Sequence, residues 1–117
     1  MHTIVVVDDD EVFSKLIKTI LELEGYQAVI VSRLADVVPA VRQVKPALLL
    51  MDIHVSHGDT LHILRELRAD AAFKTTPVVM TSGMDLAEKC LSAGADFFLL
   101  KPFRPSEVLA MIANLVN

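Results

Sequence analysis

Short apolar runs alternate along the chain with longer stretches in which apolar residues recur every three or four positions. The first run, residues 4–7, is entirely β-branched, which is typical of a strand buried on both faces of a parallel sheet. Further runs of strand length cover residues 27–31, 47–51, 78–80 and 97–100. The pattern therefore predicts five strands.

The stretches between these runs have helical periodicity. They predict helices over residues 11–24, 35–44, 61–69 and 86–93, and a last helix that begins at Pro105 or Ser106. In the first, Val12, Leu16, Ile20 and Leu23 have the spacing of an apolar helix face. Gly25 and Gly94 follow helices as C-terminal stops, Pro39 fits only a first helical turn, and Asp59 or Thr60 is suited to cap the third helix.

Alternation of strands and helices predicts the fold class. Five βα units give an α/β fold in which a doubly wound, five-stranded parallel sheet carries helices on both faces. A length of 117 residues, 53% hydrophobic residues and a mean hydropathy of +0.49 fit one ordered domain, residues 1–117. Such sheets bind ligands beyond the carboxyl ends of their strands.

Charge and composition narrow the function. The net charge is −4 and no run of basic residues occurs, which argues against direct nucleic-acid binding. No apolar run approaches the roughly 20 residues of a membrane span, and the residues before the first strand show no basic n-region or cleavage site, so we expect no secretory leader. With Cys90 as the single cysteine, which we expect to be buried in the fourth helix, the sequence predicts a cytoplasmic protein. Gly-rich phosphate loops are also absent, which disfavours a nucleotide site.

Polar residues follow four of the five predicted strands. They are Asp8 and Asp9 after the first strand, Asp52 after the third, Thr81 and Ser82 after the fourth, and Lys101 after the fifth. Because the carboxyl ends of parallel strands share one edge of the sheet, we expect these side chains to converge. Clustered carboxylates are tolerated around a hard cation, so the pattern predicts a Mg²⁺ site, with Mn²⁺ as an alternative ion.

An ionised carboxylate beside such a cation is a nucleophile. Asp52 would attack a phosphoryl group and form an aspartyl phosphate. Catalysis of phosphoryl transfer consists mainly of positioning and of neutralising the equatorial oxygens. Besides the cation, Lys101 and the hydroxyl of Thr81 are the groups that the sequence supplies for this.

The segments VVVDD, LLLMD, PVVMTS and GADFFLLKPF occur in this order. Together they make the chain similar to the response-regulator receiver domains of two-component signalling, which have a CheY-like, flavodoxin-like fold. The resemblance implies a receiver that takes a phosphoryl group on Asp52 from a histidine kinase or a phosphotransfer protein. It implies a phosphoacceptor that assists its own phosphorylation and dephosphorylation, not an enzyme in the usual sense.

The resemblance also assigns individual roles. Asp8, Asp9, Asp52 and the main-chain carbonyl of His54 would hold the metal ion. Thr81 and the aromatic side chain of Phe98 would move on phosphorylation, and the Lys101–Pro102 peptide bond would be cis. The switched surface would consist of the fourth helix, the fifth strand and the fifth helix, which would bind a downstream protein.

Two departures from the family pattern leave an alternative open. The family loop usually reads Asp-x-x-Met-Pro-Gly-x-Asp-Gly, whereas residues 52–60 here read DIHVSHGDT, without that Pro or final Gly. Residues 54–59, HVSHGD, predict a polar loop. The stretch from Thr81 to Lys101 is also about two residues short of the family norm. The alternative is a pseudo-receiver, a protein-interaction module that works without phosphorylation.

Two further hypotheses are weaker. Asp8-x-Asp10 matches the Asp-x-Asp of haloacid-dehalogenase phosphatases, but the chain is short and offers no evident cap domain. His54, His57 and His62 suggest zinc, although their spacing matches no standard zinc motif. His54 is more interesting as a side chain beside the phosphoacceptor, where it would control the access of water.

Overall fold

The sheet that the sequence predicts is present. The computed structural model describes residues 1–116. Within them, five strands form one parallel sheet in the order β2-β1-β3-β6-β7. The strands are β1 (Thr3–Val7), β2 (Gln27–Val31), β3 (Leu48–Asp52), β6 (Val78–Ser82) and β7 (Phe97–Leu100).

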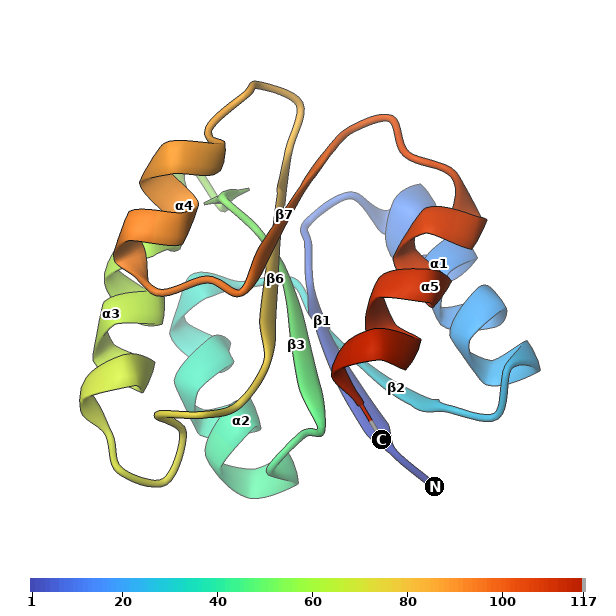
Figure 1. Cartoon of the computed structure of the whole chain (residues 1–117), viewed down its shortest axis with the longest axis horizontal. Helices are drawn as coiled ribbons and strands as arrows, with labels where there is room; N and C mark the ends of the chain where they lie inside the picture. The colour runs from blue at the N-terminus through green and yellow to red at the C-terminus, as the bar shows by residue number, and fades with distance from the viewer. Residues whose placement is uncertain (117) are drawn as a thin grey trace.

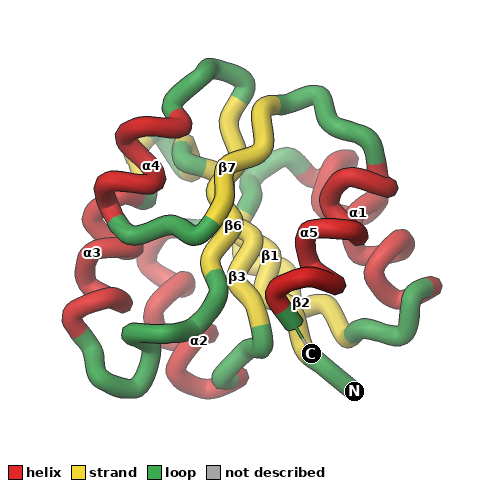
Figure 2. Tube along the Cα trace, in the orientation of Figure 1, coloured by secondary structure: helices red, strands yellow, loops and turns green. Residues whose placement is uncertain are grey.

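Helices cover both faces of this sheet. They are α1 (Glu11–Leu23), α2 (Val37–Val44), α3 (Leu61–Ala69), α4 (Ala87–Ala93) and α5 (Pro105–Leu115). Figure 1 shows α1 and α5 on one face and the other three helices on the opposite face. The tube in Figure 2 shows the loops between strand ends and helices at the top of this view. The doubly wound α/β fold is therefore confirmed.

Each face of the sheet has its own hydrophobic core. The core beneath α1 and α5 contains Ile4, Val6, Leu50, Val79 and Ile112. The core beneath α2, α3 and α4 contains Val5, Val7, Met51, Met80 and Leu64. Alternate residues of each central strand thus enter different cores, which explains why these strands are continuous apolar runs.

Local signals mark several helix ends, and Gly25, Gly94 and Pro39 lie where the sequence places them. Asp10 is the N-cap of α1, where its side chain accepts a hydrogen bond from the Phe13 amide at 3.1 Å. Gly25 and Gly94 follow α1 and α4 with φ of +89° and +114°, a region that glycine enters readily. Pro39 lies in the first turn of α2, after a 3-10 turn at Leu34–Asp36.

Two expectations are wrong. On α1, Val12, Leu16 and Leu23 are exposed, and the buried side chains are those of Ser14, Ile17 and Leu21. The apolar residues at regular spacing therefore lie mainly on the solvent side of the helix. A mixture of apolar residues all around α1 made either face plausible from periodicity alone.

The loop after β3 is also more ordered than predicted. A two-stranded antiparallel hairpin forms from β4 (His54–Val55) and β5 (Gly58–Asp59). Its turn residues, Ser56 and His57, have φ of +53° and +64°, as in the hairpin turns that usually contain Asn-Gly. Neither residue carries that turn signal, so the sequence indicated only a polar loop.

One other feature follows the sequence. Cys90 on α4 is buried within the core of the α2–α4 face, and burial raises the pKa of its thiol. In residues 1–116, none of the helices has both the length and the apolar character needed to cross a membrane.

Candidate functional site

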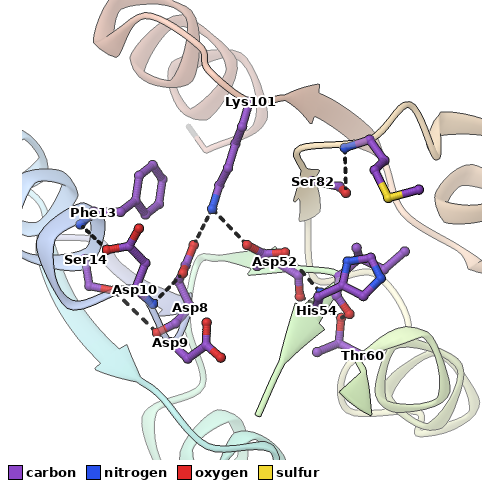
Figure 3. A network of polar contacts seen from close by, with 12 residues as sticks. Asp8, Asp9, Asp10, Phe13, Ser14, Asp52, His54, Thr60, Ser82 and Lys101 are labelled. Carbon is purple, nitrogen blue, oxygen red and sulfur yellow. Dashed lines mark hydrogen bonds and ion pairs between the residues drawn. The ribbon is translucent and has the colours of Figure 1, made fainter. Parts of the chain in front are cut away.

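The predicted polar residues gather at one edge of the sheet. Asp8 directly follows β1, Asp52 ends β3, and Lys101 directly follows β7. Lys101 contacts Asp8 directly, although the two residues are 93 positions apart in the sequence. Figure 3 shows the Lys101 side chain pointing between the two carboxylates.

The ammonium group of Lys101 joins the two acids. Its Nζ lies 2.7 Å from Oδ2 of Asp8 and 2.8 Å from Oδ2 of Asp52. The same Nζ lies 4.2 Å from the centroid of the Phe13 ring, and that ring makes an edge-on contact with Phe103. The ammonium is thus fixed by two charge-assisted hydrogen bonds and an aromatic face.

Burial and charge act against each other in this cluster. Asp8 is 2% exposed, and its pKa is raised because desolvation outweighs the hydrogen bonds from Lys101 and from the Asp10 amide. Burial lowers the pKa of Lys101, but the hydrogen bonds and charges of Asp52 and Asp8 outweigh it, so that pKa is raised. The site therefore keeps Lys101 protonated and makes the ionisation of Asp8 less favourable than in water.

Main-chain amides orient the three acids. The Asp10 amide donates to Oδ1 of Asp8 at 2.9 Å, and the His54 amide donates to Oδ1 of Asp52 at 3.0 Å. Asp9 is exposed, and its Oδ2 accepts from the Ser56 amide at 2.9 Å. The hairpin turn is therefore tied to the acid pair that follows β1.

The donor set suits a hard divalent cation. Asp8, Asp9 and Asp52 offer carboxylate oxygens, and Mg²⁺ needs only one or two such groups because waters complete its shell. Among residues 1–116, no three His, Cys, Asp or Glu side chains are already grouped as a metal site. Here one ammonium group, that of Lys101, contacts the carboxylates of both Asp8 and Asp52. The oxygen donors of the three acids are chemically compatible with Mg²⁺.

The predicted switch residues, Thr81 and Phe98, lie on the neighbouring strands β6 and β7. Thr81 is 1% exposed and stands beside Asp52 in the pairing of β3 with β6. Ser82, the next residue, is equally buried, and its Oγ accepts from the Met84 amide. Successive strand residues point to opposite faces, so these two hydroxyls lie on different sides of the sheet. Phe98 is half-buried against the α2–α4 core, and the Lys101–Pro102 bond is cis.

Two residues of the site had no functional signal in the sequence. Phe13 was expected only as a helix residue, yet its ring faces the Lys101 ammonium. Thr60 was considered only as a helix cap, yet it is fully buried and its hydroxyl donates to the main-chain carbonyl of Asp52 at 2.8 Å. A buried Thr eight residues after the acid is a signal only once the loop conformation is known.

The three histidines of this region do not form a metal site with one another. His54, His57 and His62 are exposed. His62 lies 4.0 Å from Asp59, and among the described residues these histidines are not part of any group of three His, Cys, Asp or Glu side chains positioned to hold a metal ion. The zinc hypothesis therefore has no support in this geometry.

Comparison with known proteins decides the family. The model of the response regulator receiver domain matches residues 4–113. This chain belongs to that family. The matched residues include both edge strands of the sheet, β2 and β7, and every residue of the site described above.

Individual relatives agree with this assignment. The DNA-binding response regulator MtrA of Mycobacterium tuberculosis is 32% identical over 112 residues, which are 93% of this chain and 48% of MtrA. The receiver thus spans about half the length of the curated relatives it matches.

Solved structures match the whole domain. The signal receiver domain of a Bermanella marisrubri response regulator is 30% identical with a TM-score of 0.90, and the match covers 98% of both chains. The receiver domain of the Pseudomonas aeruginosa sensor histidine kinase PA1611 is 26% identical with a TM-score of 0.88 and covers 97% of this chain and 96% of that one. That structure is described as having a magnesium ion coordinated in its active site cleft.

Proposed function

We propose that this receiver accepts a phosphoryl group on Asp52 in a Mg²⁺-dependent reaction and thereby switches a protein-binding surface. The observation that carries the proposal is the position of Lys101. Its ammonium lies 2.8 Å from Asp52 and 2.7 Å from Asp8, where it is placed to stabilise negative charge that develops on a phosphoryl group attached to Asp52.

The metal site of this proposal uses the acid cluster. Asp8, Asp9 and Asp52, with the main-chain carbonyl of His54, would hold Mg²⁺, which supplies positive charge to phosphoryl oxygens when bound. The acids fit this role in chemistry because all offer hard oxygen donors. Asp8 and Asp52 already share a cationic partner, Lys101, so their carboxylates lie close to one another.

The phosphoryl donor in this proposal is a phosphohistidine of a histidine kinase or a phosphotransfer protein. An oxygen of Asp52 attacks phosphorus, the new O–P bond forms, and the P–N bond breaks with its electron pair returning to the imidazole. Lys101 and the hydroxyl of Thr81 then compensate the phosphoryl charge. The altered contacts bias the domain toward a second state.

The proposed output surface comprises α4, β7 and α5. Leu91 on α4 and Phe97 and Leu100 on β7 are 43–50% exposed, so this side offers apolar area to a partner protein. The chain itself carries a net charge of −4, and we therefore infer that any nucleic-acid contact is made by a partner or by another domain. We place the reaction in the cytoplasm, where kinases and reduced thiols such as Cys90 coexist.

The proposal is tested by intact-mass spectrometry after incubation with acetyl phosphate, with and without Mg²⁺. We expect a phosphoryl adduct on the wild-type protein that requires Mg²⁺ and is absent from Asp52→Asn. The matched control is Asp59→Asn, which alters an exposed carboxylate of the same loop and should leave the adduct unchanged. A folded wild-type protein without an adduct, or an adduct that persists in Asp52→Asn, would contradict the proposal.

A further inference from the structure

Thr60 connects the end of β3 to the start of α3. Its side chain is 0% exposed. Its hydroxyl donates to the Asp52 carbonyl at 2.8 Å and lies 3.5 Å from the Ile53 carbonyl. Its amide donates to the same Ile53 carbonyl at 2.9 Å. One residue thus holds the backbone of two consecutive residues, the first of which is Asp52.

The buried hydroxyl needs a partner of its own. Thr60 is inaccessible to solvent, and buried polar side-chain groups are nearly always hydrogen-bonded in folded proteins. Figure 3 places Thr60 beside Asp52 and His54, on the opposite side of Asp52 from Lys101. The family loop usually ends in Gly at this position, and Gly has no hydroxyl, so the contact belongs to the sequence of this chain.

The contact acts on groups that the proposed reaction needs. The His54 amide, one peptide further along, donates to Oδ1 of Asp52 at 3.0 Å, so a shift of the main chain at Asp52 would alter this bond and the position of the His54 carbonyl. The Ile53 amide is also bound, to the Thr81 carbonyl at 2.9 Å. The Thr60 hydroxyl, which donates to the Asp52 carbonyl, therefore restrains this short segment at its other end.

We propose that the Thr60 hydroxyl is a positioning group for the phosphoacceptor: it holds the Asp52 main chain so that the carboxylate and the His54 carbonyl keep their orientation. The proposal rests on the proposed function of Asp52. It acts through preorganisation, because a reacting group held near its productive geometry requires less rearrangement at the moment of reaction.

The substitution Thr60→Val isolates this contact. It removes the hydroxyl and retains the branched shape, while the main-chain bonds from the Thr60 amide to Ile53 and from the Leu64 amide to the Thr60 carbonyl are available to any residue. Thr60→Ser restores the hydroxyl. Thr19→Val, on the exposed side of α1, is the matched control for loss of a threonine hydroxyl away from the site.

The experiment measures the rate constant of adduct formation with acetyl phosphate at saturating Mg²⁺, at a temperature where circular dichroism shows every variant folded. We expect Thr60→Val to react about fivefold more slowly, the effect of losing one hydrogen bond, and Thr60→Ser to return within about twofold of wild type. Thr19→Val should match wild type. In NMR spectra, the amide signals of Ile53 and His54 should broaden in Thr60→Val and sharpen again in Thr60→Ser.

The outcomes separate the two proposals. A wild-type protein that forms no adduct overturns the function of Asp52 and the role of Thr60 with it. A reactive wild type with an equally reactive Thr60→Val overturns the role of Thr60 alone, as does a slow Thr60→Val that Thr60→Ser does not rescue. In either case any loss of thermal stability in Thr60→Val would be a purely structural effect.

Discussion

One ammonium group serves two carboxylates in this receiver, and the two acids differ in their surroundings. Asp8 is almost completely buried, whereas the Asp52 side chain is 13% exposed. The raised pKa of Asp8 follows first from its burial, so its ionised form is less stable in the folded protein than in the unfolded chain. Keeping Asp8 ionised as a metal ligand therefore lowers the stability of the folded protein.

Neutralising Asp8 should therefore stabilise the metal-free protein. We expect Asp8→Asn to raise the free energy of unfolding at neutral pH by about 1 kcal/mol, at the low end of what relief of a buried charge gives. A raised folded-state pKa means that wild type loses stability as the pH rises from below 3.8, the ordinary value, through the raised value. The gain of the variant should be present above this interval and absent below 3.8.

Urea unfolding followed by circular dichroism in EDTA measures this difference at neutral pH and below pH 3.8. Asp10→Asn is the control, because Asp10 is exposed and its capping oxygen can be replaced by the amide oxygen. Equal stability of wild type and Asp8→Asn at neutral pH would mean that the bond from Lys101 fully offsets the burial of the charge.

At the level of the elements, the sequence predicted each strand of the sheet but not every strand end. The fourth apolar run was read as ending at Met80, whereas β6 continues through Ser82. Thr81 and Ser82 pair with Leu99 and Leu100, and this main-chain pairing does not depend on side-chain polarity. Hydrophobic runs locate strands well and locate their polar ends less well, although those ends carry the chemistry.

The same contrast explains what could be predicted of the site. Asp8, Asp52 and Lys101 could be brought together from sequence because parallel strands share one carboxyl edge. The contacts of Thr60 and Phe13 could not, since they depend on the hairpin conformation and on the rotation of α1. Ser56 and His57 have left-handed backbone conformations. Neither is the glycine or asparagine that usually indicates such a turn in a sequence.

The two helix-ending glycines make a prediction at this level. Gly25 and Gly94 both have positive φ, but a Cβ on Gly25 would meet nothing within 4 Å, whereas one on Gly94 would lie 2.8 Å from Cγ of Arg68. We expect Gly25→Ala to lower the free energy of unfolding by about 1 kcal/mol through backbone strain alone. Gly94→Ala should lower it by about 2–3 kcal/mol, because steric crowding adds to that strain.

Crowding of Arg68 by a side chain at position 94 matters because Arg68 makes several hydrogen bonds. Its guanidinium donates to the carbonyls of Gly94, Phe73 and Thr76 and to the carboxylate of Asp96, so it joins the ends of α3 and α4 to the sheet. Chemical denaturation measures the free energy of unfolding of Gly25→Ala and Gly94→Ala relative to wild type. Equal losses would show that Arg68 moves aside without weakening these bonds.

For the molecule as a whole, the site lies where distant parts of the chain meet. Asp8, Asp52 and Lys101 lie at the carboxyl ends of β1, β3 and β7. In the sheet, β1 lies between β2 and β3, whereas β7 is an edge strand. The two cores pack on opposite faces of the same sheet. A ligand that binds all three strand ends therefore binds only the folded protein, and its binding energy contributes to global stability.

Mg²⁺ should consequently stabilise the entire domain. At a free concentration about a hundred times its Kd, it should raise the free energy of unfolding by about 2.7 kcal/mol, and EDTA should reverse the gain. Calorimetry of wild type, Asp9→Asn and the control Glu22→Gln, whose carboxylate is exposed on α1, measures the effect without any phosphoryl donor. Asp9→Asn should lose most of the gain and Glu22→Gln should keep it. If Mg²⁺ raised the melting temperature of Asp9→Asn as much as that of wild type, Asp9 would not be a ligand, and the metal would bind elsewhere or through Asp8 and Asp52 alone.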